Sequence, residues 1–227
     1  ASFRESVPFY CEPKYTDACE MQMEEVYHPL LDEPVSNDLE LAGGCIITGS
    51  NASGKSTFIK AVAINAILAQ NIHTCMAKKF AMPPMQVVTS MTVRDDILEG
   101  ESYYIRELHY LKRVVEEVNK DRITLCIIDE ILRGTNTQER LAASEAILAY
   151  IAERDCIVIA ATHDMELAES MHDRYRCLHF CNYMQEGNIV FDFKIHEGKN
   201  ETTNALKLLE YIGFPNEIVA MAQNNFR

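Results

Sequence analysis

The stretch GGCIITGSNASGKSTFIKA, residues 43–61, constrains the fold of this chain more than any other segment. It passes from an apolar run to glycine, serine and lysine, and then to residues of helical pattern. Gly49 to Ser56 fit the pattern G-x-x-x-x-G-K-[ST] between an expected strand and an expected helix, which is the context that this motif requires. Glycines let the backbone curl until successive N–H groups point inward, and the helix that follows adds the positive end of its dipole. The stretch therefore predicts a strand, a phosphate-binding loop and a helix.

Each residue of this loop has an expected contact with a polyphosphate. Lys55 is expected to reach the β- and γ-phosphates, and the Ser56 hydroxyl is expected to ligate Mg²⁺. The other phosphate contacts are expected from residues Gly49, Ser50, Asn51, Ala52, Ser53, Gly54 and Thr57. The alternative, a glycine-rich turn without function, is disfavoured by the strand and the helix that flank the loop.

The segment TLCIIDEI, residues 124–131, is an apolar strand pattern that ends in two carboxylates. An acid at a strand end beside a phosphate loop can hold Mg²⁺ through water, which is the expected role of Asp129. Glu130 is expected to project toward the γ-phosphate and to polarise the attacking water. Paired acids that only terminate a strand are the alternative, and the preceding phosphate loop disfavours it.

Thr162 and His163 follow the apolar run CIVIAA, residues 156–161. A histidine at this strand end can hydrogen-bond the γ-phosphate and report whether it is present. Its place after the other two motifs strengthens this interpretation. The expected catalytic residues are therefore Lys55, Glu130 and His163, and the expected metal ligands are Ser56 and Asp129.

Strand and helix patterns alternate along the middle of the chain. This alternation predicts an α/β fold, with a mostly parallel sheet that is flanked by helices on both faces. The expected strands are 44–48, 86–92, 123–129 and 156–161, and the expected helices are 54–70, 103–119, 137–152 and a short one after Asp164.

Both ends of the chain depart from this alternation. Residues 1–42 carry four of the seven prolines and predict an irregular lead-in with short strands. The C-terminal part predicts an antiparallel hairpin that turns at 185–188, followed by helices near 201–212 and 215–225. The expected divisions are the lead-in 1–42, a core at 43–175, and a hairpin with a helical segment at 176–227.

The charge and hydropathy of the chain limit its environment. The formal net charge of -13 provides no basic cluster of the kind that grips nucleic acid, so only weak DNA contact by this piece is expected. No run of about eighteen apolar residues occurs, and the N-terminus lacks the order of a secretory signal. We therefore expect no membrane contact by this piece. Because the chain begins without an initiator methionine, we expect it to be part of a longer protein.

The cysteines indicate a reducing cytoplasm. Eight cysteines in 227 residues are too few for a disulfide scaffold. Free cysteine packs as a small apolar residue inside strands. This is the pattern around Cys45, Cys126 and Cys156.

The nearest thing to a metal-binding pattern is CLHFC, residues 177–181. Alternation along a strand would place Cys177, His179 and Cys181 on one face. No second pair of ligands lies nearby in the sequence, so ordinary packing of these residues is the favoured interpretation.

The combined order of these motifs resembles the C-terminal ATPase domain of the MutS family of DNA mismatch-repair proteins, a relative of the ABC-type ATPases. The family's phosphate loop, TGPNMGGKST, is similar to Thr48–Thr57, its DEIGRGTST to Asp129–Thr137, and its ATH to Ala161–His163. The family's DDLxxGxSTFMxE is similar to residues 95–107, its RHP and VxND elements to 27–30 and 35–38, and its hairpin and helical dimerisation segment to 187–214. The resemblance covers most of the chain.

The resemblance implies a P-loop NTPase of ABC/MutS type that uses ATP and Mg²⁺. It also implies that Val35 and Asn37 lie on the nucleotide side of the domain. In the family, two such domains pair head to tail, and a serine at the position of Ser102 completes the partner's nucleotide site in trans. The resemblance therefore implies a homodimer, with DNA bound by domains that this chain lacks.

The pattern around Ser102 is compatible with this role. Tyr104, Leu108, Leu111 and further apolar residues at helical spacing would bury one helix face and leave Ser102 at the exposed N-terminus. A plain helix cap, worth about 0.5–2 kcal/mol, is the alternative interpretation, and one residue can serve both purposes.

The chain also departs from the family pattern. Ser50, Ala52 and Ser53 change the phosphate loop, and Pro34 and Val35 stand where MutS proteins stack the adenine on an aromatic ring. These differences favour a divergent MutS-like branch.

Several functions remain open. The first is an ATP-driven dimeric switch that is coupled to DNA-binding domains outside this chain. The second is a nucleotide-binding interaction module with little turnover, and a MutS-like ATPase with a role outside repair is a third. An ABC transporter subunit is disfavoured because the LSGGQ signature is absent, and a small-molecule kinase is disfavoured because Asp-Glu is followed by Arg-Gly-Thr and a later Thr-His.

Overall fold

The computed structural model describes residues 3–50, 52–91, 103–132, 135–185, 188–198, 209 and 212–225. Within them, a six-stranded sheet has the order β10-β9-β4-β8-β7-β6, and a four-stranded sheet has the order β1-β5-β2-β3. The strands of the larger sheet are β4 (Gly44–Thr48), β6 (Gln86–Ser90), β7 (Thr124–Asp129), β8 (Cys156–Ala161), β9 (Arg176–Gln185) and β10 (Asn188–Glu197). The helices are α1 (Lys55–Ile72), α2 (Tyr103–Val118), α3 (Thr137–Ala152), α4 (Met165–Ser170) and α6 (Asn216–Asn225).

The central strands of the larger sheet are apolar because both of their faces are covered. β7 and β8 are buried at every residue, and β4 is buried from its second residue onward. Every neighbouring pair among β6, β7, β8, β4 and β9 is parallel, whereas β10 runs antiparallel to β9. Continuous apolar runs of this kind are typical of parallel strands between two layers of helices. The predicted α/β class, strands and hairpin are confirmed.

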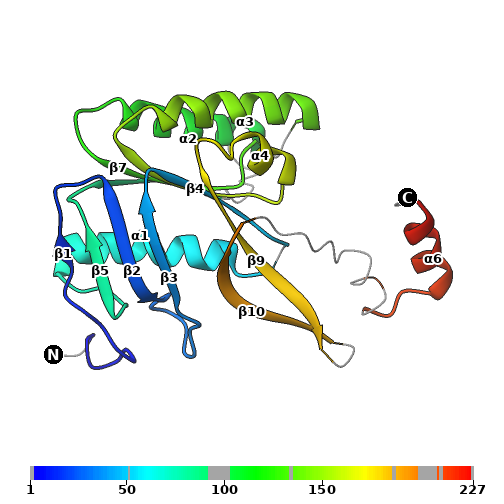
Figure 1. The fold of residues 1–227 in the computed structure, drawn as a ribbon, viewed down its shortest axis with the longest axis horizontal. Coiled ribbons are helices and arrows are strands. Elements are labelled where there is room, and N and C mark those ends of the chain that lie inside the picture. Colours follow the sequence, from blue (N-terminus) through cyan, green and yellow to red (C-terminus); the bar gives the residue numbers. More distant parts are fainter. Residues whose placement is uncertain are drawn as a thin grey trace.

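Alternate residues of these strands divide between two hydrophobic cores. Helices α2, α3 and α4 cover one face of the larger sheet, and α1 covers the other (Figure 1). Cys45 and Ile47 of β4 pack on the side of α1, whereas Ile46 between them packs on the side of α2 and α3. The predicted apolar face of α2 is confirmed, since Leu111 and Val118 are buried in the second core.

The short strands expected in the N-terminal lead-in are present, but they belong to a regular four-stranded sheet. Its strands are β1 (Lys14–Tyr15), β2 (Glu20–Val26), β3 (Asn37–Ala42) and β5 (Lys79–Met82). β2 and β3 alternate between buried and exposed residues, and β5, which the sequence analysis did not predict, lies between β1 and β2. The sheet thus joins three strands from the first 42 residues to β5, which lies on the far side of α1 in the sequence.

Helix α1 lies between the two sheets. Its apolar residues share one core with Met21 and Met23 of β2 and with Ile127 and Ile159 of the larger sheet. The buried Asn65 side chain ties this helix to the smaller sheet: its Nδ2 donates to the Tyr27 carbonyl at 3.0 Å, and its Oδ1 accepts from the Met76 amide at 2.5 Å. These bonds fix the middle of α1 relative to Tyr27, which follows β2, and to Met76, which precedes β5.

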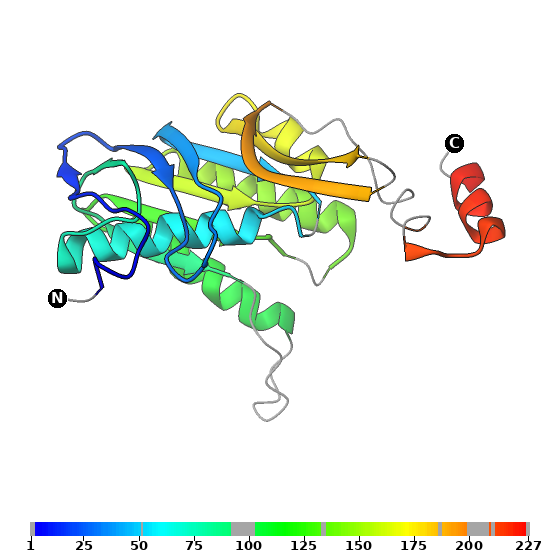
Figure 2. The same cartoon turned by 90° about the horizontal axis from the view of Figure 1, so that it is seen from below.

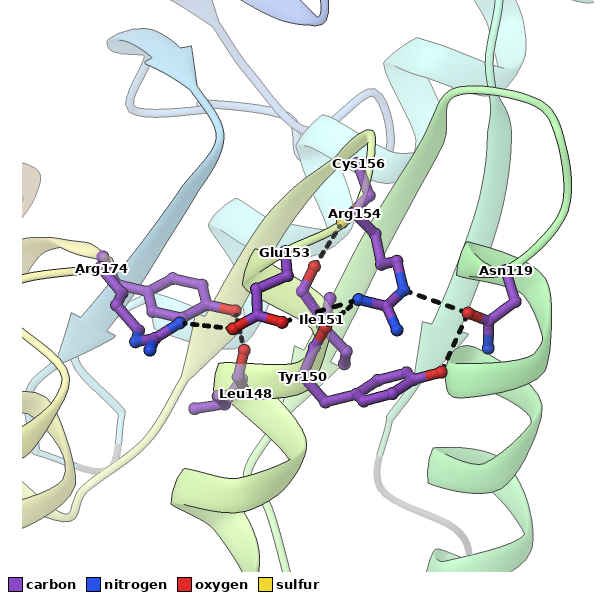
Figure 3. A network of polar contacts seen from close by, with 9 residues as sticks. Asn119, Leu148, Tyr150, Ile151, Glu153, Arg154, Cys156 and Arg174 are labelled. Atoms are coloured by element: carbon purple, nitrogen blue, oxygen red, sulfur yellow. Dashed lines mark hydrogen bonds and ion pairs between the residues drawn. The ribbon is translucent and has the colours of Figure 1, made fainter.

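A polar network joins the C-terminal ends of α2 and α3 (Figure 3). The hydroxyl of Tyr150 donates to Asn119 Oδ1 at 3.0 Å, and Arg154 Nε donates to the same oxygen at 3.1 Å. The Arg154 guanidinium also lies 3.9 Å from the centroid of the Tyr150 ring. The network holds the C-terminal ends of the two helices together. This edge of the larger sheet is opposite to the one at which β7 and β8 have their C-terminal ends.

The strand cysteines pack as apolar residues, as predicted. Cys45, Cys126 and Cys156 are buried, and the eight cysteines are free. Burial raises the pKa of the Cys45 thiol to about 12, so this thiol stays protonated at neutral pH.

The two predicted C-terminal helices have different outcomes. α6 corresponds to the second one, and both views place it apart from the two sheets (Figure 2). Most of the first, near 201–212, falls outside the described residues. No helix in the described part of the chain is long and apolar enough to cross a membrane.

We predict that Asn65→Leu lowers the free energy of unfolding by about 2–4 kcal/mol, because it leaves the buried Tyr27 carbonyl and Met76 amide without the bonds that Asn65 makes. Urea denaturation measures this loss. Asn71→Leu is the matched control, since Asn71 lies exposed on the same helix and bonds only the Ile67 carbonyl one turn away. The control should change stability by less than about 0.5 kcal/mol. Equal losses in the two variants would contradict the role of Asn65.

Candidate functional site

The glycine-rich loop joins the end of β4 to the start of α1. Gly49 and Gly54 have φ values of 147° and 105°, and Ala52 has a φ of 66°. A Cβ on Gly49 would lie 2.7 Å from the Phe180 carbonyl oxygen of β9. Only glycine therefore allows the loop to pass so close to the backbone of the neighbouring strand.

Lys55 is the first residue of α1, and its side chain is buried beneath the loop. Its Nζ donates to the Gly49 carbonyl at 2.6 Å and to the Ser50 carbonyl at 2.9 Å. These bonds place a positive charge inside the curve of the loop. The arrangement provides the cationic centre that a polyphosphate needs.

The second helical residue meets the end of β7. The Ser56 hydroxyl donates to Asp129 Oδ1 at 3.2 Å, and Asp129 is buried. A carboxylate beside a hydroxyl at a strand end is a donor set of hard oxygen atoms, which suits Mg²⁺. The structure thus brings together the two residues that the sequence predicts as metal ligands.

Glu130 and His163 form a second pair at the ends of β7 and β8. Glu130 Oε2 lies 2.9 Å from His163 Nδ1, and the Glu130 amide donates to the Ala161 carbonyl at 2.8 Å. Glu130 is buried, whereas the His163 side chain is about half exposed. The φ of Glu130 is 61°, a left-handed conformation that costs a residue other than glycine about 1–3 kcal/mol. This backbone conformation turns the carboxylate out of the sheet.

A cavity of about 420 Å³ opens beside the loop. One wall is formed by the loop, the start of α1 and Glu130, and the other by residues between β2 and β3 together with two phenylalanines of the hairpin. The residues that line it include Tyr27, His28, Leu31, Val35, Asn37, Ser50, Ala52, Ser53, Gly54, Lys55, Ser56, Thr57, Glu130, Phe180 and Phe193. The cavity therefore has a polar end with the Lys55 cation and the Glu130 carboxylate, and an apolar, aromatic end.

Phe193 is a cavity residue that the sequence analysis missed. The register of β10 against β9 shifts between Phe191 and Ile195, and Phe193 within this bulge has a φ of 53°. A Cβ on Gly54 would lie 3.2 Å from Phe193 Cδ1, so the ring packs directly over the loop. No sequence signal marks this residue, because only the bulge brings it to the cavity.

Asn37 holds this bulge in place. Its Nδ2 donates to the Phe193 carbonyl at 3.0 Å, and its Oδ1 accepts from the Ile195 amide at 2.8 Å. Asn37 is buried. Its side chain thus contacts the strand that carries Phe193, in addition to lining the cavity as a predicted nucleotide-side residue.

The family model MutS domain V matches residues 45–227 of this chain. The chain belongs to the MutS family. It is 29% identical over 219 residues to the DNA mismatch repair protein MutS of Thermus thermophilus, a match that covers 94% of this chain and 26% of that protein. The protein of the same name from Thermus caldophilus is 31% identical over 191 residues (83% and 23%), and that from Bacillus subtilis is 26% identical over 228 residues (95% and 26%). The chain spans about a quarter of the length of these curated relatives.

The structure describes some of the other residues singled out in the sequence and not others. Val35 lines the cavity and is 41% exposed. Asn51 and Ser102 lie outside the described residues, so their predicted contacts stay predictions. Within the described residues, Cys177 and His179 join no group of metal-ligating side chains: the Cys177 thiol donates to the Ala168 carbonyl at 3.3 Å, and His179 Nδ1 lies 3.1 Å from the Gly198 carbonyl oxygen. These two residues have the packing role that the sequence analysis favoured.

We predict that Asn37→Ala speeds hydrogen exchange of the Ile195 amide by about five- to 150-fold, which corresponds to the loss of about 1–3 kcal/mol from a buried hydrogen bond. Exchange is followed by NMR or mass spectrometry under native conditions. Ser36→Ala is the matched control, because Ser36 contacts β10 through its main-chain oxygen, which accepts from Lys194 Nζ. Unchanged exchange of the Ile195 amide in Asn37→Ala would show that Asn37 does not hold the bulge.

Proposed function

We propose that this chain is the ATP-binding and ATP-hydrolysing domain of a longer, MutS-like protein from a divergent branch of the family. The observation that carries the proposal is the convergence of two pairs, Ser56 with Asp129 and Glu130 with His163, beside one glycine-rich loop. Carboxylates and a lysine that surround a phosphate-sized loop at the ends of parallel strands are the parts that phosphoryl transfer needs. In this protein, ATP binding and hydrolysis would act as a switch.

The polar end of the cavity fits a triphosphate. The loop amides and the start of α1 would bind the phosphate oxygens, and Lys55 would exchange its bonds to two loop carbonyls for bonds to the β- and γ-phosphates. Ser56 and Asp129 would hold Mg²⁺, which neutralises phosphate charge when bound. Both groups are already in contact, so little rearrangement is required.

Glu130 and His163 would act on the γ-phosphate. Glu130 would orient a water molecule and accept its proton, because its carboxylate is the buried base that lines the cavity. The contact with His163 Nδ1 would hold the carboxylate in position, while the exposed part of the imidazole ring meets the phosphate. The left-handed backbone of Glu130 supports this role, since strained residues gather at functional sites.

The aromatic end of the cavity fits the nucleobase. Phe193 provides a ring, and Val35 and Leu31 provide apolar contacts, in the wall that faces the loop. Phe193 would thus replace the aromatic residue that the sequence lacks at position 35. An aromatic face with aliphatic neighbours binds a flat base by stacking.

Two chains would pair to complete the site. Ile212, Ile218 and Met221, in and just before α6, are 68%, 46% and 66% exposed, and apolar side chains exposed together often mark an interface. The predicted contact of Ser102 with the partner's nucleotide belongs to the same proposal. DNA would be bound by other parts of the full protein, because this piece carries a net charge of -13.

We predict that Glu130→Gln lowers ATP turnover by about 100-fold or more, because the variant loses its general base, while ATP affinity stays within about threefold. Steady-state phosphate release and fluorescent-nucleotide titration measure the two quantities. Glu166→Gln is the matched control, since Glu166 is an exposed acid in the first turn of α4. Tight ATP binding with background turnover in the unmodified protein would favour the interaction module over the switch. Equal turnover in Glu130→Gln and the unmodified protein would exclude the proposed base.

We predict that turnover per chain rises with protein concentration, because a partner chain completes each site. Phosphate release measured over about a hundredfold range of concentration, alongside sedimentation, tests this dependence. A flat profile across the range in which the chain dimerises would contradict hydrolysis that depends on pairing.

A further inference from the structure

Three metal-ligating side chains meet on the hairpin β9–β10, outside the lining of the cavity. They are Cys181, Asp192 and His196, and their ligand atoms all lie within 4.8 Å of one another. All three are half-buried. Their residue types, one thiol, one carboxylate and one imidazole, are those that proteins use to bind zinc.

The bulge in β10 creates this cluster. Phe180 pairs with Ile195 and Asn182 pairs with Phe191, so the single residue Cys181 of β9 stands opposite residues 192–194. The extra length folds β10 so that Asp192 and His196 lie beside the same thiol. In a regular hairpin, a single residue of β9 would stand opposite only one residue of β10.

The distance between Cys181 and Asp192 suits a tetrahedral ion. Bond lengths of about 2.3 Å to sulfur and about 2.0 Å to nitrogen or oxygen place ligand atoms about 3.3–3.6 Å apart. Cys181 Sγ lies 3.6 Å from Asp192 Oδ2, and His196 Nε2 lies 2.7 Å from the same oxygen. The second pair is now in hydrogen-bond contact and needs to open by about 0.6 Å to admit an ion.

The ligands are held by neighbouring groups. Asp192 Oδ1 accepts from the Lys194 amide at 3.0 Å, which leaves Oδ2 directed at the other two side chains. The His196 ring packs against the His179 ring with a centroid separation of 5.5 Å. Such outer contacts orient metal ligands and strengthen binding.

The same residues do not form a nucleophilic cysteine site. The carboxylate stands between the thiol and the imidazole, whereas an activated cysteine needs the imidazole as its direct neighbour. Burial and the nearby Asp192 carboxylate also raise the pKa of the Cys181 thiol, which is the opposite of nucleophile activation.

We propose that Cys181, Asp192 and His196 bind one zinc ion, with a water molecule as the fourth ligand. A thiol and an imidazole select zinc over Mg²⁺ or Ca²⁺, which prefer oxygen ligands alone. The ion also joins both sides of the bulge that presents Phe193 to the cavity. Its binding would therefore fix that wall of the cavity in place.

Metal binding by the apo protein tests the site without nucleotide. The protein is freed of metal under reducing conditions and titrated with Zn²⁺ against a chromogenic chelator, and in parallel with Co²⁺. We expect one tight equivalent of zinc and a thiolate-to-cobalt charge-transfer band. Cys181→Ser should abolish the band, and Asp192→Asn and His196→Gln should each weaken zinc binding by more than about tenfold.

Two controls separate this site from others in the chain. Cys177→Ser changes a half-buried thiol on the same strand that lies outside the cluster, and it should leave binding unchanged. Asp129→Asn removes the carboxylate of the proposed Mg²⁺ site and should leave the cobalt band unchanged. Zinc should also slow hydrogen exchange of the Lys194 and Ile195 amides in the unmodified protein.

The results that would overturn the site are equally specific. The proposed zinc site is excluded if the unmodified protein binds no tight equivalent of zinc. It is also excluded if Cys181→Ser keeps full zinc binding and an intact cobalt band. Circular dichroism establishes that each variant is folded. If Cys181→Ser does not fold, Asp192→Asn and His196→Gln decide the matter through the same titration.

Discussion

The position of α1 between two sheets is the constraint on which the rest of the structure depends. A helix that packs apolar residues on both sides cannot rotate or slide without opening a core. Its first turn therefore holds Lys55 beneath the loop and Ser56 against Asp129. The buried bonds of Asn65 add a polar restraint, since their loss would leave backbone groups unpaired inside the protein.

Parallel strands then gather the remaining polar groups at one edge. Ile47 of β4 and Asp129 of β7 both stand opposite Ala161 of β8, so the three strands end at the same level. Asp129 is the last residue of β7, and the loop, Glu130 and His163 follow the strand ends closely. The carboxyl edge of a parallel sheet is a general place for ligand sites, because the loops that leave it converge there. Here the strained turn at Glu130 aims its carboxylate at the cavity.

The bulge in β10 links two features that lie far from these motifs in the sequence. It presents Phe193 to the cavity on one side and brings Asp192 beside Cys181 on the other. Asn37, from a strand of the smaller sheet, holds the bulge through two hydrogen bonds. The N-terminal sheet is thus a structural part of the site, because it provides the contact that sets the conformation of the hairpin.

The sequence by itself determined the local units: the loop between β4 and α1, the acids that end β7, the histidine after β8, and the hairpin. Each of these units is encoded by the spacing of apolar residues, the spacing of glycines or the turn residues within one short segment. Such signals do not depend on contacts between distant parts of the chain. The contacts of Asn37, the place of Phe193 and the meeting of Cys181 with Asp192 were decided only by the tertiary structure. The register shift in β10 brings residues 192–194 opposite Cys181, and bonds from a strand more than a hundred residues away hold it, so no local pattern encodes it.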